Sequence, residues 1–199
     1  MSEEVDGIKI ILLGESGVGK TNLINVFLQF QFDDFSVSTM SSNAFHGFYN
    51  YNKKKYKYYI WDTAGQEMCR GINKIFVRDA KIILLVYSID NRHSFEEINF
   101  WINFVKDVIE DDKYIIALVA NKSDLIEEQT VLDEEGNELA QKNKFEFLVT
   151  SAAKDAAGFR KFVFKLLEQY IDMTGGIISG KNNIKLKKIN YKNKKKKSC

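Results

Sequence analysis

Residues 14–21 read "GESGVGKT" and directly follow the apolar run "IKIILL" of residues 8–13. The β-branched apolar run predicts a buried strand, and the apolar positions from Lys20 onward have the spacing of a helix. Glycines between a strand and a helix let the backbone curl tightly, with its N–H groups pointing inward. The spacing Gly-x-x-x-x-Gly-Lys-Thr in this setting predicts a loop that binds phosphate groups.

Every residue of this loop is a candidate phosphate ligand. We expect backbone N–H groups and the positive end of the following helix to hold the phosphates. Lys20 is expected to reach the β- and γ-phosphates of a nucleotide, and the Thr21 hydroxyl to bind Mg²⁺. A glycine-rich turn that matches by chance is the alternative, less favoured because the strand, the loop, the helix and the Lys-Thr pair occur together. The candidates are Gly14, Glu15, Ser16, Gly17, Val18, Gly19, Lys20 and Thr21.

Apolar runs and helical periodicity alternate along the rest of the chain. This alternation predicts an α/β fold, in which a parallel sheet is covered by helices on both faces. Ser94 is placed to cap one of the helices. An aromatic- and lysine-rich segment, residues 45–59, predicts a hairpin that turns near residues 52–54. The expected strands are 8–13, 56–61, 81–87, 114–120 and 145–149, and the expected helices are 20–30, 94–110, 133–144 and 156–173.

The size and composition of the chain fit one domain. It has 199 residues, of which 45% are hydrophobic, enough for one sizeable core. No apolar stretch approaches the roughly 20 residues that a membrane-spanning helix needs. Two cysteines, Cys69 and Cys199, cannot form a disulfide framework, and the acidic start of the chain is unlike a signal peptide. These features predict a cytoplasmic protein.

The charge of the chain is divided between an acidic body and a basic tail. Residues 1–180 hold 20 basic and 27 acidic residues, a net charge of −7, whereas residues 181–199 hold nine lysines and no acid. An acidic body argues against a folded face that binds nucleic acid. Five lysines within residues 192–197, just before Cys199, favour contact with an anionic membrane surface. A solvated tail and a nuclear-localisation signal are the alternatives.

The stretch "NKSD", residues 121–124, directly follows an expected strand. The carboxyl ends of such strands form the ligand-binding edge of an α/β sheet. Asp124 can accept hydrogen bonds from N1–H and N2–H₂ of guanine, whereas adenine offers no such pair of donors. Asn121 would brace the loop, and the stem of Lys122 would lie over the ring. Alone, the stretch could be an ordinary polar turn, but together with a phosphate loop about 100 residues upstream it favours a guanine nucleotide.

A third stretch, "WDTAGQE" at residues 61–67, ends another expected strand. Asp62 is placed to hold the metal through water, Gly65 to give its N–H to a γ-phosphate, and Gln66 to orient a water for in-line attack. A loop with a buried Trp is the alternative. Its position after an apolar strand favours the catalytic interpretation.

Together these motifs resemble those of small GTPases of the Ras superfamily, and the chain is most similar to the Rab family. The resemblance covers residues of about 8 to 173 and includes "GESGVGKT", "WDTAGQ", "NKSD" and "TSA" in order. The stretches "FVRDA" and "VYSIDNRHSFEEINFWI" are similar to those of Rabs. The resemblance implies a single-domain P-loop GTPase fold at 8–173, with a mostly parallel six-stranded sheet, one antiparallel strand, and flexible ends at 1–7 and 174–199.

The resemblance also implies further site residues. Thr39 corresponds to the switch I threonine, whose hydroxyl binds Mg²⁺ and whose N–H touches the γ-phosphate. Phe32 corresponds to an aromatic that packs edge-on against guanine, although a plain core Phe is an equal alternative from sequence alone. Ser151, Ala152 and Ala153 correspond to the turn that contacts the base. Ala153 stands where Rabs have lysine, which predicts weaker nucleotide binding.

Switch I departs from the Rab pattern. In "TMSSNAF", residues 39–45, Phe45 comes one position later than the Rab aromatic, and Ala44 stands in its place. Neighbouring residues of a strand point to opposite faces, so an unchanged register would turn this aromatic away from the surface that Rabs present to effectors. That surface would comprise Trp61, Phe76 and either Ala44 or a displaced Phe45.

The function implied by the resemblance is a switch that binds GTP or GDP with Mg²⁺ and hydrolyses GTP slowly, Gln66 orienting the water. An exchange factor, a GTPase-activating protein and effectors are implied as partners, and the chain would be a monomer that binds no nucleic acid. It would cycle from the cytoplasm to the cytosolic face of a membrane, held by the tail and a lipid on Cys199. The alternatives are a GTP-binding module without turnover, a phosphate-loop kinase or ATPase, and a protein that binds nucleic acid through its lysine tail.

Overall fold

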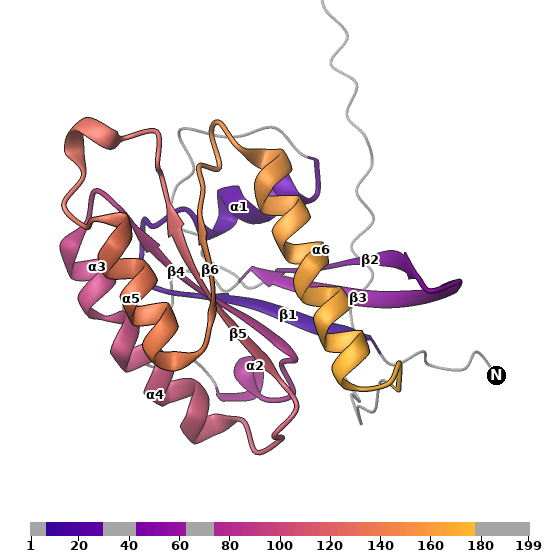
Figure 1. Cartoon of the computed structure of the whole chain (residues 1–199). Helices are drawn as coiled ribbons and strands as arrows, with labels where there is room; N and C mark the ends of the chain where they lie inside the picture. Colours follow the sequence, from indigo (N-terminus) through magenta and orange to yellow (C-terminus); the bar gives the residue numbers. More distant parts are fainter. Residues whose placement is uncertain (1–6, 30–42, 63–73, 178–199) are drawn as a thin grey trace, which may run out of the picture.

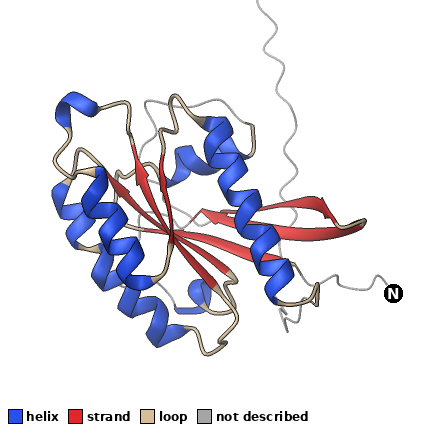
Figure 2. Ribbon diagram, in the orientation of Figure 1, coloured by secondary structure: helices blue, strands red, loops and turns tan. Residues whose placement is uncertain are grey.

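The computed structural model describes residues 7–29, 43–62 and 74–177, which form one sheet with helices on both faces (Figures 1 and 2). The strand order is β2-β3-β1-β4-β5-β6. Only the pair of β2 with β3 is antiparallel, so the expected fold class is confirmed. The strands are β1 (Ile8–Leu13), β2 (Asn43–Tyr51), β3 (Lys54–Asp62), β4 (Ile82–Ser88), β5 (Ile115–Asn121) and β6 (Glu146–Val149).

The helices are divided between the two faces of the sheet. Helices α1 and α6 contribute buried residues to one core cluster, while α2, α4 and α5 contribute to a second cluster on the other face. Every residue of β1 and β4 is buried, as expected of central strands covered on both sides. The helices are α1 (Lys20–Phe27), α2 (Lys74–Val77), α3 (Arg92–Glu96), α4 (Ile98–Val108), α5 (Asp133–Asn143) and α6 (Ala156–Met173).

The helix expected over residues 94–110 is wrong in two respects. The segment forms two helices that meet at Glu97, and the cap of the first is Asn91, whose side-chain oxygen accepts a hydrogen bond from Ser94 N at 3.1 Å. Ser94 is instead buried inside α3, where its hydroxyl donates to the carbonyl of Asn91 at 2.7 Å. The helix begins at Arg92, so the N-cap position falls on Asn91, whose side chain satisfies an N–H of the first turn.

The predicted hairpin turn is found at Asn52 and Lys53. Both residues have positive φ, 48° and 63°, as in the two-residue turns that match the twist of paired strands. In the β2–β3 register Ala44 lies opposite Trp61, and Phe45 lies opposite Ile60. Ala44 therefore shares the face of Trp61, whereas Phe45 packs against the core cluster of α1 and α6.

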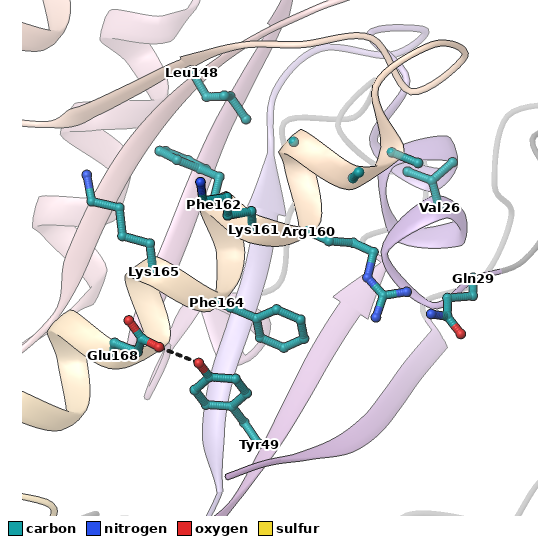
Figure 3. A pocket seen from close by; sticks show the side chains of 13 residues that line it. Val26, Gln29, Tyr49, Leu148, Arg160, Lys161, Phe162, Phe164, Lys165 and Glu168 are labelled. Carbon is teal, nitrogen blue, oxygen red and sulfur yellow. Dashed lines mark hydrogen bonds between the residues drawn. The ribbon is translucent and has the colours of Figure 1, made fainter. Parts of the chain in front are cut away.

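One face of the hairpin is fixed to α6. The rings of Tyr49 and Phe164 stack with centroids 4.7 Å apart, and the Tyr49 hydroxyl donates to Glu168 (Figure 3). Nearer the turn, the Tyr51 hydroxyl donates to Asp172 at 2.9 Å. The residues in contact with Tyr49 line a pocket between the end of α1, β2 and α6, into which Arg160 also points (Figure 3).

Lys9 is a buried lysine in β1, 3% exposed, whose ammonium donates to the carbonyl of Arg78 at 2.9 Å and lies over the Trp61 ring. Burial lowers the pKa of Lys9 to about 8, partly opposed by the charge of Asp79. Between this value and its ordinary pKa near 10.5, the unfolded chain binds more protons than the folded one.

The stability of the wild type should therefore rise, relative to that of Lys9→Met, as the pH increases from about 8 to 10.5. The relative gain should be about 3 kcal/mol across this window, because each pKa unit corresponds to about 1.4 kcal/mol. Urea unfolding of both proteins at several pH values measures it. Parallel stability curves would contradict a depressed Lys9 pKa.

Candidate functional site

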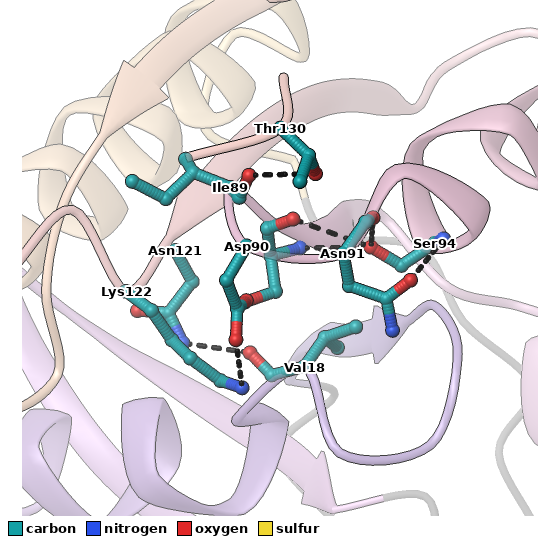
Figure 4. Close-up of polar contacts among 9 residues, drawn as sticks. Val18, Ile89, Asp90, Asn91, Ser94, Asn121, Lys122 and Thr130 are labelled. Atoms are coloured by element: carbon teal, nitrogen blue, oxygen red, sulfur yellow. Dashed lines mark hydrogen bonds and ion pairs between the residues drawn. The ribbon is translucent and has the colours of Figure 1, made fainter. Parts of the chain in front are cut away.

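The candidate site lies at the carboxyl edge of the sheet, where the segments after β1, β4, β5 and β6 meet. Figure 4 shows residues from the first three of these segments. Asp62 closes the site at the end of β3. In α/β folds this edge is the usual place for a ligand, because the connecting loops form a crevice there. The phosphate-loop and guanine motifs, about 100 residues apart in sequence, are thereby brought into contact.

The loop after β1 needs glycine at two positions. A Cβ at Gly14 would come within 2.0 Å of the carbonyl oxygen of Val86, and one at Gly19 within 2.4 Å of the Asn121 amide nitrogen. Both residues also have positive φ, 147° and 92°. Gly17 has a positive φ, 78°, but no atom of the described residues lies within 4 Å of where its Cβ would be. This loop can approach β4 and β5 closely because Gly14 and Gly19 have no side chain.

Lys20 lies at the start of α1, almost entirely buried, and its ammonium donates to the carbonyls of Gly14 and Glu15, both at 2.8 Å. The loop is therefore folded around its own cation. A positive charge held at a helix N-terminus suits phosphate oxygens. Of the other loop residues, Val18 is buried, whereas Ser16 is partly exposed.

Thr21 and Asp62 form the candidate metal site. The Thr21 hydroxyl lies 3.1 and 3.0 Å from the two carboxylate oxygens of Asp62, which is buried. Burial raises the pKa of Asp62, opposed by the Thr21 hydrogen bond and the charge of Lys20. A buried carboxylate beside a hydroxyl fits Mg²⁺, which prefers oxygen ligands and keeps ligands from phosphate and water.

The protein donors to this metal are few. Within residues 7–29, 43–62 and 74–177, no three His, Cys, Asp or Glu side chains gather closely enough to hold a metal ion by themselves.

Asn121, the last residue of β5, links the two loops. Its amide nitrogen donates to the carbonyl of Val18 at 2.7 Å (Figure 4). Its amide oxygen accepts from the N–H of Ala152 at 3.1 Å. The side chain is 1% exposed, so both bonds are shielded from water. The position of the phosphate loop is thus tied to that of the guanine motif by one buried amide.

Asp124 is held by Ser151. The Ser151 hydroxyl donates to Asp124 and accepts from the N–H groups of Ala153 and Lys154, at 3.1 and 3.0 Å. Asp124 itself is exposed, as expected of a group that meets a ligand. A carboxylate oriented by a buried hydroxyl can present fixed acceptors to a base.

Lys122 has a partner that the sequence motifs did not include. Its ammonium forms an ion pair with Asp90 at 3.3 Å, and Asp90 also accepts from the Ser88 hydroxyl (Figure 4). This pair holds the lysine stem, and the backbone of Lys122 has a positive φ of 63°. The available signal was the position of Asp90, two residues beyond the buried strand β4, at the edge where ligands bind.

Several predicted site residues lie outside the described part of the chain. Thr39, Phe32, Gly65 and Gln66 belong to this group, as does Cys199. Their roles stay predictions.

The described helices include none that is both long and apolar enough to cross a bilayer.

Comparisons with known proteins agree with the geometry of this site. The sequence matches the Ras family over residues 9–172. The rice Ras-related protein RGP2 (Oryza sativa subsp. japonica) is 40% identical over 144 residues, which are 72% of this chain and 66% of that protein. The Arabidopsis thaliana protein RABA2b is also 40% identical, over 72% of this chain and 67% of its own length. Rab11C of Lotus japonicus is 36% identical over 81% of this chain and 74% of its own.

Proposed function

The chain belongs to the Ras family of small GTPases, and from that premise we propose that it is a Rab-type switch that alternates between GDP and GTP forms in membrane trafficking. The observation that carries this proposal is the buried amide of Asn121, which bonds to both Val18 and Ala152. It ties the loop that we propose binds phosphate to the loop that we propose binds the base.

Selection of guanine rests on Asp124. The hydroxyl of Ser151 orients its carboxylate, which then accepts from the two neighbouring N–H donors of guanine. Adenine has no such donors, so the carboxylate would be left desolvated and unpaired opposite it. Lys122, held by Asp90, covers the ring.

Binding of the phosphates rests on the loop after β1. Its N–H groups and Lys20 would hold the β- and γ-phosphates, and Thr21 and Asp62 would hold Mg²⁺, Asp62 through water. Bound Mg²⁺ supplies positive charge to the phosphate oxygens. Gln66 would orient the attacking water, while Thr39 and Gly65 would contact the γ-phosphate and release both switches when it is lost.

The partners follow from this cycle. We propose that an exchange factor, a GTPase-activating protein and effectors act through the two switch regions. We propose also that the lysines of residues 192–197, together with a lipid on Cys199, hold the GTP form on an anionic membrane.

The direct test is displacement of a fluorescent GDP analogue, with Mg²⁺, by GTP, GDP and ATP, followed by phosphate release over hours. GTP and GDP should compete, ATP should not, and phosphate should appear slowly. Gln66→Leu should bind as tightly as the wild type but release at least tenfold less phosphate. Binding without any phosphate, even from the wild type, would favour a GTP-binding module without turnover. Competition by ATP would contradict the guanine assignment.

A further inference from the structure

The β2–β3 hairpin has a face that the described structure leaves largely open, apart from the ring of Tyr59, which lies against Gly7. We name it the outer hairpin face; it carries alternate residues of both strands, since successive side chains of a strand point to opposite sides. Each of its residues is at least partly exposed to solvent. They are His46, Phe48, Asn50, Lys55, Lys57 and Tyr59.

Lysines and aromatic rings are paired on this face. The ammonium of Lys55 lies 4.3 Å from the centre of the Phe48 ring, and that of Lys57 lies 4.7 Å from the Tyr59 ring. Phe48 is nonetheless 54% exposed, one of the most exposed large apolar side chains among the described residues. Exposed aromatic and lysine side chains together are typical of a surface that meets the boundary between lipid and water.

The charge of the hairpin is opposite to that of the domain. Four lysines occur between Asn43 and Trp61, and no acid does, although residues 1–180 together carry a net charge of −7. Lys53 and Lys54, at the turn, are both exposed. The hairpin is therefore a concentrated basic site on an acidic body.

The outer hairpin face points away from α6, because the opposite face of the hairpin is bound to that helix. The opposite face of the hairpin is fixed to α6 by the stacking of Tyr49 on Phe164 (Figure 3) and by the Tyr51–Asp172 hydrogen bond. The turn end projects from the body of the domain (Figure 1). A flat surface could therefore approach the hairpin without meeting the rest of the fold first.

The lysine-rich tail starts beside the same hairpin. A Cβ on Gly176 would lie 2.9 Å from the Tyr56 hydroxyl and 3.8 Å from the Lys54 ammonium. The next described residue, Ile177, is 73% exposed, and the nine lysines of residues 181–199 follow. A surface that attracts the tail is thereby brought close to the hairpin.

We propose that the outer hairpin face lies on an anionic lipid surface and forms a second membrane contact beside the tail, orienting the domain. The proposal rests on the proposed function of a switch that acts at membranes. Charge complementarity and the place where the tail starts support lipid as the occupant. Single-stranded nucleic acid fits less well, because bases need open ring faces to stack on, and here lysine ammonium groups lie over those faces.

The test uses the full chain with an unmodified Cys199 and vesicles of phosphatidylcholine with or without phosphatidylserine. Lys55→Glu/Lys57→Glu should weaken binding to the anionic vesicles about tenfold or more, since each lysine near such a surface strengthens binding about fivefold. The control, Lys106→Glu/Lys142→Glu, makes the same change of charge at exposed positions of α4 and α5 and should weaken binding threefold or less.

A third variant separates insertion from charge. Phe48→Ser should weaken binding to anionic vesicles about fivefold with no change of net charge, because an exposed ring no longer enters the interface. Equal binding by the hairpin and control variants would overturn the proposal and leave the tail as the only contact. Loss of single-stranded RNA binding by the hairpin variant, with vesicle binding unchanged, would overturn it in favour of nucleic acid.

Nucleotide binding is measured on the same samples. All three variants should bind GDP as the wild type does, since the hairpin turn is remote from the nucleotide loops. Failure of the wild type to bind GDP would overturn the proposed function whatever the vesicles show. Normal GDP binding with unselective vesicle binding would overturn only the membrane contact.

Discussion

Asp124→Asn is expected to lower the affinity for GDP about a thousandfold and to make xanthosine diphosphate the better ligand. The carboxylate accepts two hydrogen bonds from guanine, each worth about 1.5–3 kcal/mol when one partner is charged. An amide in its place turns a donor towards the N2–H₂ group of guanine. Xanthine carries a carbonyl oxygen at that position, which accepts from the new amide.

Competition of GDP and xanthosine diphosphate against a fluorescent analogue measures the exchange of preference. Ser151→Ala is the matched control, because it removes the hydroxyl that orients Asp124 but leaves the carboxylate itself. It should weaken GDP binding about tenfold without any gain for xanthine. Unchanged GDP affinity in Asp124→Asn would show that the base is selected elsewhere.

Asn121→Ala is expected to destabilise the GDP-bound protein by about 2–4 kcal/mol and to speed GDP release at least a hundredfold. The substitution leaves the carbonyl of Val18 and the N–H of Ala152 without their partner, and each buried unpaired group costs about 1–3 kcal/mol. Release is accelerated because the phosphate loop and the base loop are no longer held in register.

Urea unfolding in excess GDP and displacement of a fluorescent analogue give the two values. Asn137→Ala, at an exposed position of α5, is the control and should change stability by less than about 0.5 kcal/mol. Asn121→Asp should destabilise the protein at least as much as Asn121→Ala, since one oxygen of its buried carboxylate would face the carbonyl of Val18 without a donor. A wild-type release rate in Asn121→Ala would contradict the linking role.

Much of the fold follows from local pattern. The buried strands β1, β4 and β5 are continuous apolar runs. The hairpin turn contains Asn52, a residue type that tolerates positive φ, and Lys53, which is exposed to solvent. Their positions could be predicted because the pattern and the tertiary environment agree. The mostly parallel sheet and the placement of helices on both faces follow from βα alternation and from the resemblance to GTPases.

Other features depend on contacts that local pattern does not carry. The break at Glu97 and the cap at Asn91 differ from prediction, since Ser94 looks like a cap in sequence but is buried against Ser88. The pair of Asp90 with Lys122 joins residues 32 positions apart. The choice between Ala44 and Phe45 required the pairing register, because sequence spacing alone left both open.

The three glycines of the phosphate loop differ in how readily evolution can replace them with another residue. At Gly14 and Gly19 a single added methyl group would collide with Val86 or Asn121, so even the smallest substitution disturbs the joint between strands and loop. At Gly17 no atom of the described residues lies within 4 Å of an added Cβ, so the fold itself imposes only the backbone strain of a positive φ, about 1–2 kcal/mol. Lineages that descend from this chain should therefore hold positions 14 and 19 for the sake of the fold alone, whereas any further constraint on position 17 comes from the phosphate that the loop is proposed to bind.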